Sequence, residues 1–479
     1  MLFNSFEFIF IFLPVVLTAY YLISNHRSRL WLLLISSYFF YGWWNYKFLS
    51  LLLLSTSLDY YLGLLIYNTQ SEQKRKKLLI LSVITNLGIL GFFKYFNFFV
   101  ENFYTLSSLI NNESSRTFFL EIVLPVGISF YTFQSMSYTI DVYYKKTQPH
   151  RDFMAFASYV ALFPQLVAGP IIRHSDLVYQ LEDASRGKWN GNNFARGLFF
   201  FVIGLSKKII IADHLAGAID PALDNLDAVS TLESWLCALG YTFQIYFDFS
   251  GYSDMAIGLG WMMNFHFITN FNSPYKSKSI TEFWQRWHIS LSAWLKDYLY
   301  IPLGGNRNGL YKTYRNLFLT MLLGGLWHGA NWVYVIWGAY HGILLAIERA
   351  LGFHKKNTEI PPTNKIIFST LKKRIITFFL IIISWVFFRS PDISFSFNWF
   401  KKLFSPPFTF SLYQFSSRVR DKYFAALVVS ILISFLVKNT SELNFENYMH
   451  KRYAFLLGLL LCLCLVFFTK NSPFLYFQF

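Results

Sequence analysis

Two histidines in one uncharged, apolar stretch are the side chains of this sequence best suited to chemistry. The stretch runs from Asn316 to Ile347, contains His328 and His341, and has no Asp, Glu, Lys or Arg. The ordinary pKa of histidine, about 6.5, suits a general base at neutral pH. A base buried among apolar helices could remove the proton of a hydroxyl as that hydroxyl attacks an activated acyl group. The alternative is that His328 is a hydrogen-bonded packing residue between helices.

Other kinds of active site find little support in the sequence. It has no HExxH, GxSxG, Walker or Cys/His zinc motif. His328 and His341 are thirteen residues apart with no carboxylate between them, which argues against a metal site. We expect no tightly bound cofactor either. Asp248 and Asp254 lie six residues apart, on different faces of a helix, so we expect hydrogen bonds to serine, tyrosine or backbone groups rather than paired acid and base carboxylates.

The stretch that carries the two histidines has an unusual length. One bilayer crossing needs about 20 apolar residues and two need about 40, whereas this stretch has 32. We therefore expect a bent or paired helical element, with Gly324, Gly325 and Gly329 close to the bend. A titratable ring at this depth is costly unless it faces the protein interior or a water-filled cavity. The glycines would place His328 there rather than against lipid.

The composition of the 479 residues indicates a membrane protein. Hydrophobic residues make up 54% and charged residues 14%, against about 25% charged residues in soluble proteins. The net charge is +16, but the basic residues form short runs between apolar spans, which the positive-inside rule explains better than nucleic-acid binding. We therefore expect an all-α polytopic membrane protein with a single domain, residues 1–479, and no nucleic-acid partner.

Basic loops and apolar spans together predict a topology. The loops 26–29, 74–77 and 145–146 fit the cytoplasmic side, with the N-terminus outside and its first apolar segment retained as a span. Spans are expected at 8–24, 30–46, 48–67, 78–93, 118–140, 193–212, 235–260, 375–388, 423–437 and 453–469. The total is on the order of eleven to thirteen membrane segments.

Two further segments have the pattern of helices that do not simply cross the bilayer. Prolines and a glycine interrupt the uncharged segment 163–170, which predicts a broken helix that either lines a cavity or is a simple kink. An aromatic stripe at spacings of three and four predicts an interfacial helix that is capped by Ser279 or Thr281 and continues to Tyr298.

Several motifs resemble those of the membrane-bound O-acyltransferase (MBOAT) family. They are Phe283-Trp284-Gln285-Arg286-Trp287-His288-Ile289-Ser290-Leu291-Ser292 and Leu326-Trp327-His328-Gly329. The segments 247–254, 272–275 and 167–170 are similar to a bacterial branch of that family, which includes the membrane subunit of alginate O-acetylation and the D-alanyl transfer protein of teichoic acids. The resemblance is dense over residues 164–342. The motifs are specific together, whereas Trp-His-Gly alone would be weak.

The resemblance implies a fold and a set of site residues. The fold is a ring of tilted helices around a central tunnel, with re-entrant or interfacial helices. His328 would be the catalytic histidine, and His288 a second functional position on the donor side. We expect three residues to line the cavity or support its walls: Trp327, Asp248 and Asn272. We expect His341 to have a structural role.

The resemblance also implies a reaction and its partners. The donor, acetyl-CoA or another acyl thioester, enters from the cytoplasm, and the acyl group passes to a hydroxyl on the far side. The acceptor would be an exported polysaccharide or a soluble periplasmic acetyltransferase-like partner, and the protein would lie among the lipids of the cytoplasmic (inner) membrane. D-alanyl transfer and peptidoglycan O-acetylation by the same fold stay open. So does a non-enzymatic transporter of a glycan or lipid precursor that uses the broken helices as its pathway.

Overall fold

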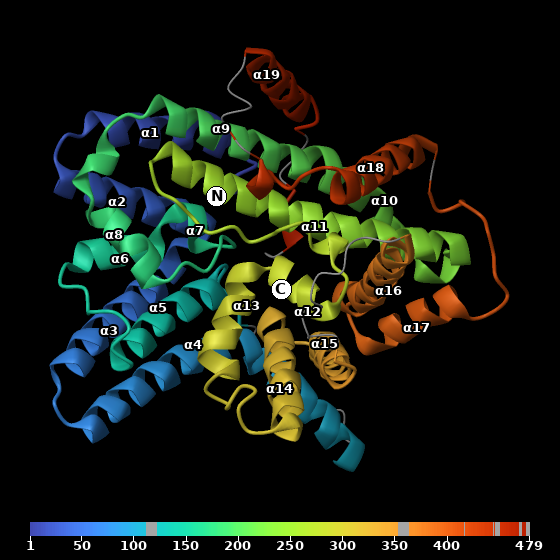
Figure 1. Ribbon diagram of the computed structural model, residues 1–479, viewed down its shortest axis with the longest axis horizontal. Helices are drawn as coiled ribbons and strands as arrows, with labels where there is room; N and C mark the ends of the chain where they lie inside the picture. Colours follow the sequence, from blue (N-terminus) through green and yellow to red (C-terminus); the bar gives the residue numbers. More distant parts are fainter. Residues whose placement is uncertain are drawn as a thin grey trace. The chain divides into compact units, whose positions relative to one another are not determined.

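The structure is a computed structural model, and it describes residues 1–111, 122–352, 364–415, 417–443, 445, 451–468 and 472–475. All regular elements in these ranges are helices, as the prediction of an all-α protein requires (Figure 1). The chain forms two compact units: unit 1 comprises Met1–Leu198 and Ala256–Ile268, and unit 2 comprises Phe199–Met255 and Thr269–Phe479. Two helices, α9 (Gly191–Ser206) and α11 (Thr231–Met262), contribute residues to both. The assignment of one domain to residues 1–479 stays a prediction.

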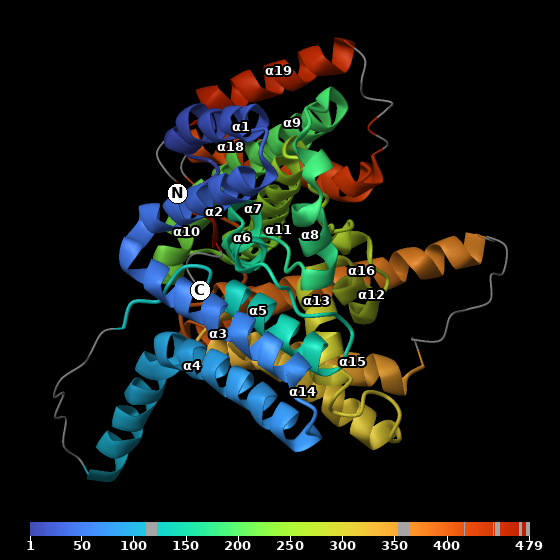
Figure 2. The ribbon, with the colours of Figure 1, turned by 90° about the vertical axis from the view of Figure 1, so that its left-hand side faces the viewer.

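Unit 1 is built mainly from the N-terminal helices. They are the π-helix η1 (Glu7–Phe12), α1 (Leu13–Leu22), α2 (His26–Asn45), α3 (Leu49–Asn68), α4 (Glu72–Asn111), α5 (Ile128–Tyr143), α6 (Phe153–Ala161), α7 (Phe163–Leu166) and α8 (His174–Glu182). Helices α3, α4 and α5 pack side by side (Figure 2). The buried carboxylate of Asp59 on α3 accepts hydrogen bonds from Ser82 and Asn86 on α4 and from Ser135 on α5, which ties the three helices together.

In the described part of the chain, three helical segments are long and apolar enough to cross a membrane. They are His26–Asn68, Glu72–Ser108 and Arg420–Glu442, and two shorter apolar segments are Glu7–Leu22 and Arg452–Val466. The first of them contains α2 and α3, which have 20 residues each and match the predicted spans 30–46 and 48–67. The protein is therefore a polytopic membrane protein. The number of crossings and the ring around a tunnel stay predictions.

The predicted helix break at 163–170 is present in unit 1. Helix α6 ends at Ala161, and α7 continues for only one turn, Phe163–Leu166. The interrupted backbone finds side-chain partners, since Ser37 Oγ accepts from the N–H of Phe163 at 3.0 Å and Gln165 Nε2 donates to the carbonyl of Tyr159 at 2.6 Å. The break is therefore buried and hydrogen-bonded within the protein, as backbone at membrane depth must be.

Unit 2 carries the motifs with the histidines. Beside its parts of α9 and α11 it contains the π-helix η4 (Lys207–Ala212), α10 (Asp213–Asp224), α12 (Ile280–Arg286), α13 (Ile289–Leu295), the π-helix η7 (Lys296–Tyr300), α14 (Leu310–His328), α15 (Trp332–Ala350), α16 (Asn364–Arg389), α17 (Ile393–Phe404), α18 (Ser417–Leu436) and α19 (Lys451–Val466). The stretch 316–347 forms the helical pair α14 and α15, which lie side by side in Figure 1. The prediction of a paired element with Gly329 at the bend is confirmed.

Several predicted boundaries differ from the structure. Helix α4 does not end at residue 93, where the predicted span 78–93 ends, but continues to Asn111. Helices α10 and α17 were not predicted, because their polar residues fall outside any apolar span. Residues 112–121, which include the start of the predicted span 118–140, lie outside the described residues.

Candidate active site

Glycines bring the backbones of α14 and α15 into contact. A Cβ atom on Gly325 would lie 2.9 Å from the Cα of Gly338, and one on Gly342 would meet the backbone of α14. Gly338 and Gly342 are four residues apart, the spacing with which membrane helices pack most closely. The tight crossing fixes the residues beside it, which include Trp337 on α15 and His328 at the end of α14.

His328 is the last residue of α14 and is only 4% exposed. The next residue, Gly329, has an extended backbone, and a side chain there would collide with the ring of Tyr334. The imidazole of His328 is held by edge-to-face contacts with Trp337 at 5.1 Å and Phe388 at 5.3 Å between ring centroids. A helix C-terminus carries partial negative charge, so this position stabilises the imidazolium that forms when the ring takes a proton.

His288 lies between two short helices rather than inside one long helix. The predicted continuous helix to Tyr298 is wrong at this point, although Ser279 caps its first part, α12, as expected, by accepting from the N–H of Glu282 at 3.0 Å. His288 has φ 42° and ψ 54°, a left-handed conformation that separates α12 from α13 and that costs about 1–3 kcal/mol in a non-glycine residue. Its ring is fully buried and packs edge-on against Phe249, 4.7 Å between centroids. Strained residues of this kind are typical of functional sites.

Asn270 connects the loop before α12 to the turn at His288. Its side-chain Oδ1 accepts from the backbone N–H of Ser290 at 3.1 Å and from the hydroxyl of Ser290 at 2.9 Å, and it lies 3.3 Å from Nδ1 of His288. Its backbone carbonyl accepts from the N–H of Ile289 at 3.0 Å. His288 does not cap α13 with its own side chain, so Asn270 supplies the acceptors for the first N–H groups of that helix.

The indole of Trp327 contacts both candidate histidines. Its ring centroid is 5.0 Å from that of His328, its neighbour in sequence, and 6.1 Å from that of His288. The structure therefore brings together three of the residues that the sequence singled out, although two belong to α14 and one lies 40 residues earlier in the chain.

His341 is buried on α15 beside the same aromatic cluster. Trp284 Nε1 donates to its Nδ1 at 3.3 Å, and its ring centroid is 4.9 Å from that of Trp337. Because the indole N–H can only donate, Nδ1 of His341 must be the acceptor and Nε2 carries the proton of the neutral ring. No group in the described part of the chain accepts from this Nε2, and none accepts from Nδ2 of Asn270. Buried polar atoms of this kind are costly unless water or a ligand binds them.

Asp248 and Asn272 do not contact either histidine in the described contacts. Asp248 pairs with the ammonium of Lys208 at 2.7 Å and accepts from the backbone N–H of Leu475 at 3.0 Å, and Asp213 also lies 2.9 Å from that ammonium. The expectation of serine, tyrosine or backbone partners thus missed the main partner, a buried lysine. The backbone N–H of Asn272 donates to the carbonyl of Arg286 at the end of α12 at 2.9 Å, and its carbonyl accepts from the guanidinium of Arg286 at 3.1 Å.

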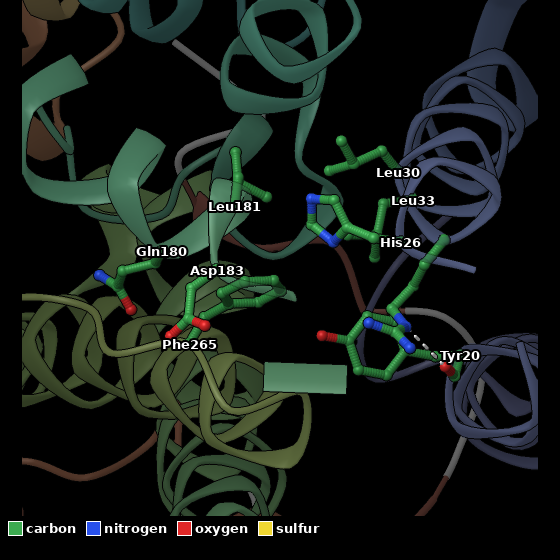
Figure 3. A pocket seen from close by; sticks show the side chains of 9 residues that line it. Tyr20, His26, Leu30, Leu33, Gln180, Leu181, Asp183 and Phe265 are labelled. Atoms are coloured by element: carbon green, nitrogen blue, oxygen red, sulfur yellow. Dashed lines mark hydrogen bonds between the residues drawn. The ribbon is translucent and has the colours of Figure 1, made fainter. Parts of the chain in front are cut away.

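A small cavity in unit 1 is separate from these residues. It is lined by Tyr20, His26, Arg29, Leu30, Leu33, Gln180, Leu181, Asp183 and Phe265 (Figure 3). Its volume of about 10 Å³ has room for roughly one water molecule. Arg29 is held there by carbonyl groups, including that of Tyr20 at 3.2 Å. None of the histidines or other site residues predicted from the sequence lines this cavity.

Sequence reasoning missed Asn270, Lys208 and Phe388 as neighbours of the predicted residues. Asn270 and Asn272 stand two residues apart in one turn-rich segment, and nothing in their types or spacing shows which of them meets His288. Lys208 was visible as a charge within an apolar span, and such charges usually find a partner. That signal could have paired it with Asp248.

The described part of the chain is an all-helical membrane protein in which buried histidines lie beside helices that glycines pack closely together. The sequence profile of the MBOAT, membrane-bound O-acyltransferase family, matches residues 38–389, which include His288, His328 and His341. The chain belongs to this family and is therefore an O-acyltransferase. Membership of this family leaves the transporter alternative without support.

Named relatives are similar over most of the chain. A probable alginate O-acetylase AlgI of Pseudomonas aeruginosa is 48% identical over 91% of this chain and 80% of its own length. A peptidoglycan O-acetyltransferase of Helicobacter pylori is 39% identical over 100% of this chain and 98% of its own length. A teichoic acid D-alanyltransferase of Bacillus subtilis is 28% identical over 53% of this chain and 65% of its own length. The D-alanyl alternative therefore fits less well than O-acetylation.

Proposed function

We propose that this protein moves acetyl groups from an acyl thioester, expected to be acetyl-CoA, to hydroxyls of an exported polysaccharide. The acceptor receives the group directly or through a soluble periplasmic partner, and the protein lies in the cytoplasmic (inner) membrane. Family membership supports acyl transfer as the reaction. The 48% identity to a protein named as an alginate O-acetylase supports a polysaccharide acceptor.

One observation carries the catalytic part of the proposal: two buried histidines, His328 and His288, both contact the indole of Trp327 within unit 2. His328 acts as general base and takes the proton of the acceptor hydroxyl while its oxygen attacks the thioester carbonyl carbon. The C–O bond forms, the C–S bond breaks, and the imidazolium returns the proton to the departing sulfur as a thiol. The helix end at His328 stabilises the intermediate cation.

His288, which also contacts Trp327, supports the same reaction. Its strained, left-handed backbone places a fully buried ring at the junction of α12 and α13, where a packing residue would need no such conformation. We assign it to the binding or activation of the acyl donor, as the resemblance implies. The proposed function depends less on this assignment of His288 than on the position of His328.

A second candidate function is acetylation of peptidoglycan hydroxyls. The observation that favours it is the match to the Helicobacter pylori peptidoglycan O-acetyltransferase over nearly the whole of both chains. The two candidates share the donor, the base and the direction of transfer. They differ only in which glycan presents the hydroxyl.

The test measures acetyl esters on both glycans in cells that carry the wild-type gene or a variant. Mild alkali releases acetate from secreted polysaccharide and from purified peptidoglycan, and the fraction with the protein-dependent signal identifies the acceptor. For His328→Gln, we expect a loss of roughly 10²- to 10⁴-fold in transfer, the usual contribution of a general base. For His288→Gln, we expect a clear loss of both thioester cleavage and acceptor acetylation.

The matched control is His214→Gln, which changes a half-buried histidine of α10 whose ring packs on Phe467. This variant and the two site variants must insert into the membrane at wild-type amounts. Transfer at the wild-type level by His328→Gln would remove His328 from the reaction. Acetyl esters on neither glycan, in cells that make both, would overturn the proposed acceptor class.

A further inference from the structure

The hydrogen bonds of Asn270 determine which way its amide group points. The backbone N–H of Ser290 lies 3.1 Å from the side-chain atom assigned as Oδ1, and a backbone N–H can only donate. An amide nitrogen at this position would set donor against donor. The atom that faces Ser290 is therefore the oxygen, and the same atom faces Nδ1 of His288 at 3.3 Å.

The position of this oxygen determines the tautomer of His288. An amide oxygen has no proton to give, so Nδ1 of His288 must carry the hydrogen of their shared bond. A neutral imidazole has one N–H, so the lone pair stands at Nε2. Without Asn270, the other tautomer, with the proton on Nε2, would be open to this ring.

We infer that Asn270 is a positioning residue of the acyl transfer, which holds His288 as the Nδ1–H tautomer so that Nε2 is the nitrogen able to accept a proton or a hydrogen bond. This inference rests on the proposed function, because it assigns a task to His288 within that reaction. Asn270 is 1% exposed and its acceptors also hold the start of α13. The same side chain therefore fixes the backbone turn and the proton position of the ring.

The type of residue matters as well as its place. An aspartate could accept the same hydrogen bonds, but its charge would favour the imidazolium, whereas the neutral amide selects a tautomer without stabilising a charged ring. Phe249 and Trp327, whose rings contact the imidazole, carry no charge either. An asparagine here keeps His288 in a neutral form with a defined basic nitrogen.

The experiment reads the tautomer directly, by ¹⁵N nuclear magnetic resonance of the full-length protein with labelled histidine side chains. Protonated and lone-pair nitrogens have distinct shifts, and the signals of His288 are assigned by their absence in His288→Gln. We expect Nδ1–H in the wild-type protein and in Asn270→Asp, and a population of Nε2–H in Asn270→Leu, which has similar size but no acceptor. Acetyl transfer should fall at least about tenfold in Asn270→Leu, in the range of residues that orient a catalytic ring.

The control for a lost helix cap is Asp392→Ala, which removes the side chain that caps α17 in the same unit. It should leave both the His288 signals and the transfer rate unchanged. Exclusive Nδ1–H in a folded Asn270→Leu protein, or a ring without a proton on Nδ1 in Asn270→Asp, would overturn the inference while an inactive His288→Gln still supported the proposed function. Wild-type transfer by His288→Gln would instead overturn the role of His288 and the positioning role together.

Discussion

The imidazole of His328 stands perpendicular to the indole of Trp337, with an interplanar angle of 90° and 5.1 Å between the ring centroids. The two residues come from different helices, and Trp337 directly precedes Gly338, where α15 touches α14. The orientation of the candidate base thus depends on how closely two helices approach.

Replacing Trp337 should test this orientation. Trp337→Leu removes the aromatic surface that the edge of the imidazole meets, so we expect kcat for acetyl transfer to fall about tenfold with little change in KM for the donor. Trp337→Phe keeps an aromatic ring and should retain more activity. Steady-state kinetics of purified protein checks both variants, and equal activity of the leucine and phenylalanine variants would contradict the prediction.

The contact between α14 and α15 should not tolerate a methyl group. In Gly338→Ala the new Cβ would meet the carbonyl of Met321 and lie 3.1 Å from the Cα of Gly325, so the helices must separate. We expect a loss of about 1–3 kcal/mol in stability and a decrease in transfer, measured by thermal unfolding in detergent and by acetylation. Gly88→Ala on α4 is the matched control, because nothing lies within 4 Å of its Cβ and alanine favours a helix. Equal stability of the two variants would argue against a tight crossing.

His174 on α8, outside the candidate spans, should make stability depend on pH. Burial against Tyr138 and Tyr159, and then repulsion by His150, lower the pKa of His174 from about 6.5 to about 3. The unfolded chain therefore binds this proton at a higher pH than the folded protein does, so the contribution to stability is present above pH 6.5 and is lost as the pH falls toward 3. At pH 5 the loss is about 2 kcal/mol.

The measurement for His174 is thermal unfolding at pH 8 and pH 5, compared with His174→Gln. The glutamine has no charge to gain, so its unfolding temperature should change less between the two pH values. If the unfolding temperature of the wild-type protein and of His174→Gln changed equally between pH 8 and pH 5, the pH dependence would come from groups other than His174.

Neutralising Lys208 should destabilise the protein more than neutralising Asp248, one of its two partners. Lys208→Met leaves the carboxylates of Asp248 and Asp213 without their cation, so we expect a loss of about 3–5 kcal/mol. Asp248→Asn should cost less, because Asp213 still pairs with the lysine. The double variant Lys208→Met with Asp248→Asn should be more stable than Lys208→Met alone. Thermal unfolding ranks the three proteins, and a larger loss in Asp248→Asn than in Lys208→Met would contradict the pairing.

The features that the sequence was enough to predict are those that depend on a local pattern of residues. The length of the uncharged stretch, with Gly324, Gly325 and Gly329 near its middle, was enough to predict a bent or paired helical element, because length and glycine positions act within that stretch. Composition was enough to predict a membrane protein of helices. The cap at Ser279 was predictable because a cap needs only its own side chain and the N–H groups that follow it.

What the sequence could not predict depends on distant contacts. The break at His288 needs a left-handed conformation, which is uncommon in a non-glycine residue and which Asn270, Phe249 and the start of α13 hold in place. The aromatic stripe continued past this point with helical spacing, so periodicity alone predicted one helix. The pairing of Asp248 with Lys208 joins residues 40 apart, beyond the reach of any helical period.

The ion pairs of the π-helix η4 limit where a residue can be inserted into or deleted from this chain. Its neighbouring residues Lys207 and Lys208 pair with Asp254 at 2.6 Å and with Asp248 at 2.7 Å, two carboxylates six positions apart on α11. The two pairs form together only if the register between the segments is kept. One residue inserted between the carboxylates would rotate one of them by about 100° and leave its lysine buried without it. Surface loops can lengthen or shorten, but the segment 248–254 must keep its length.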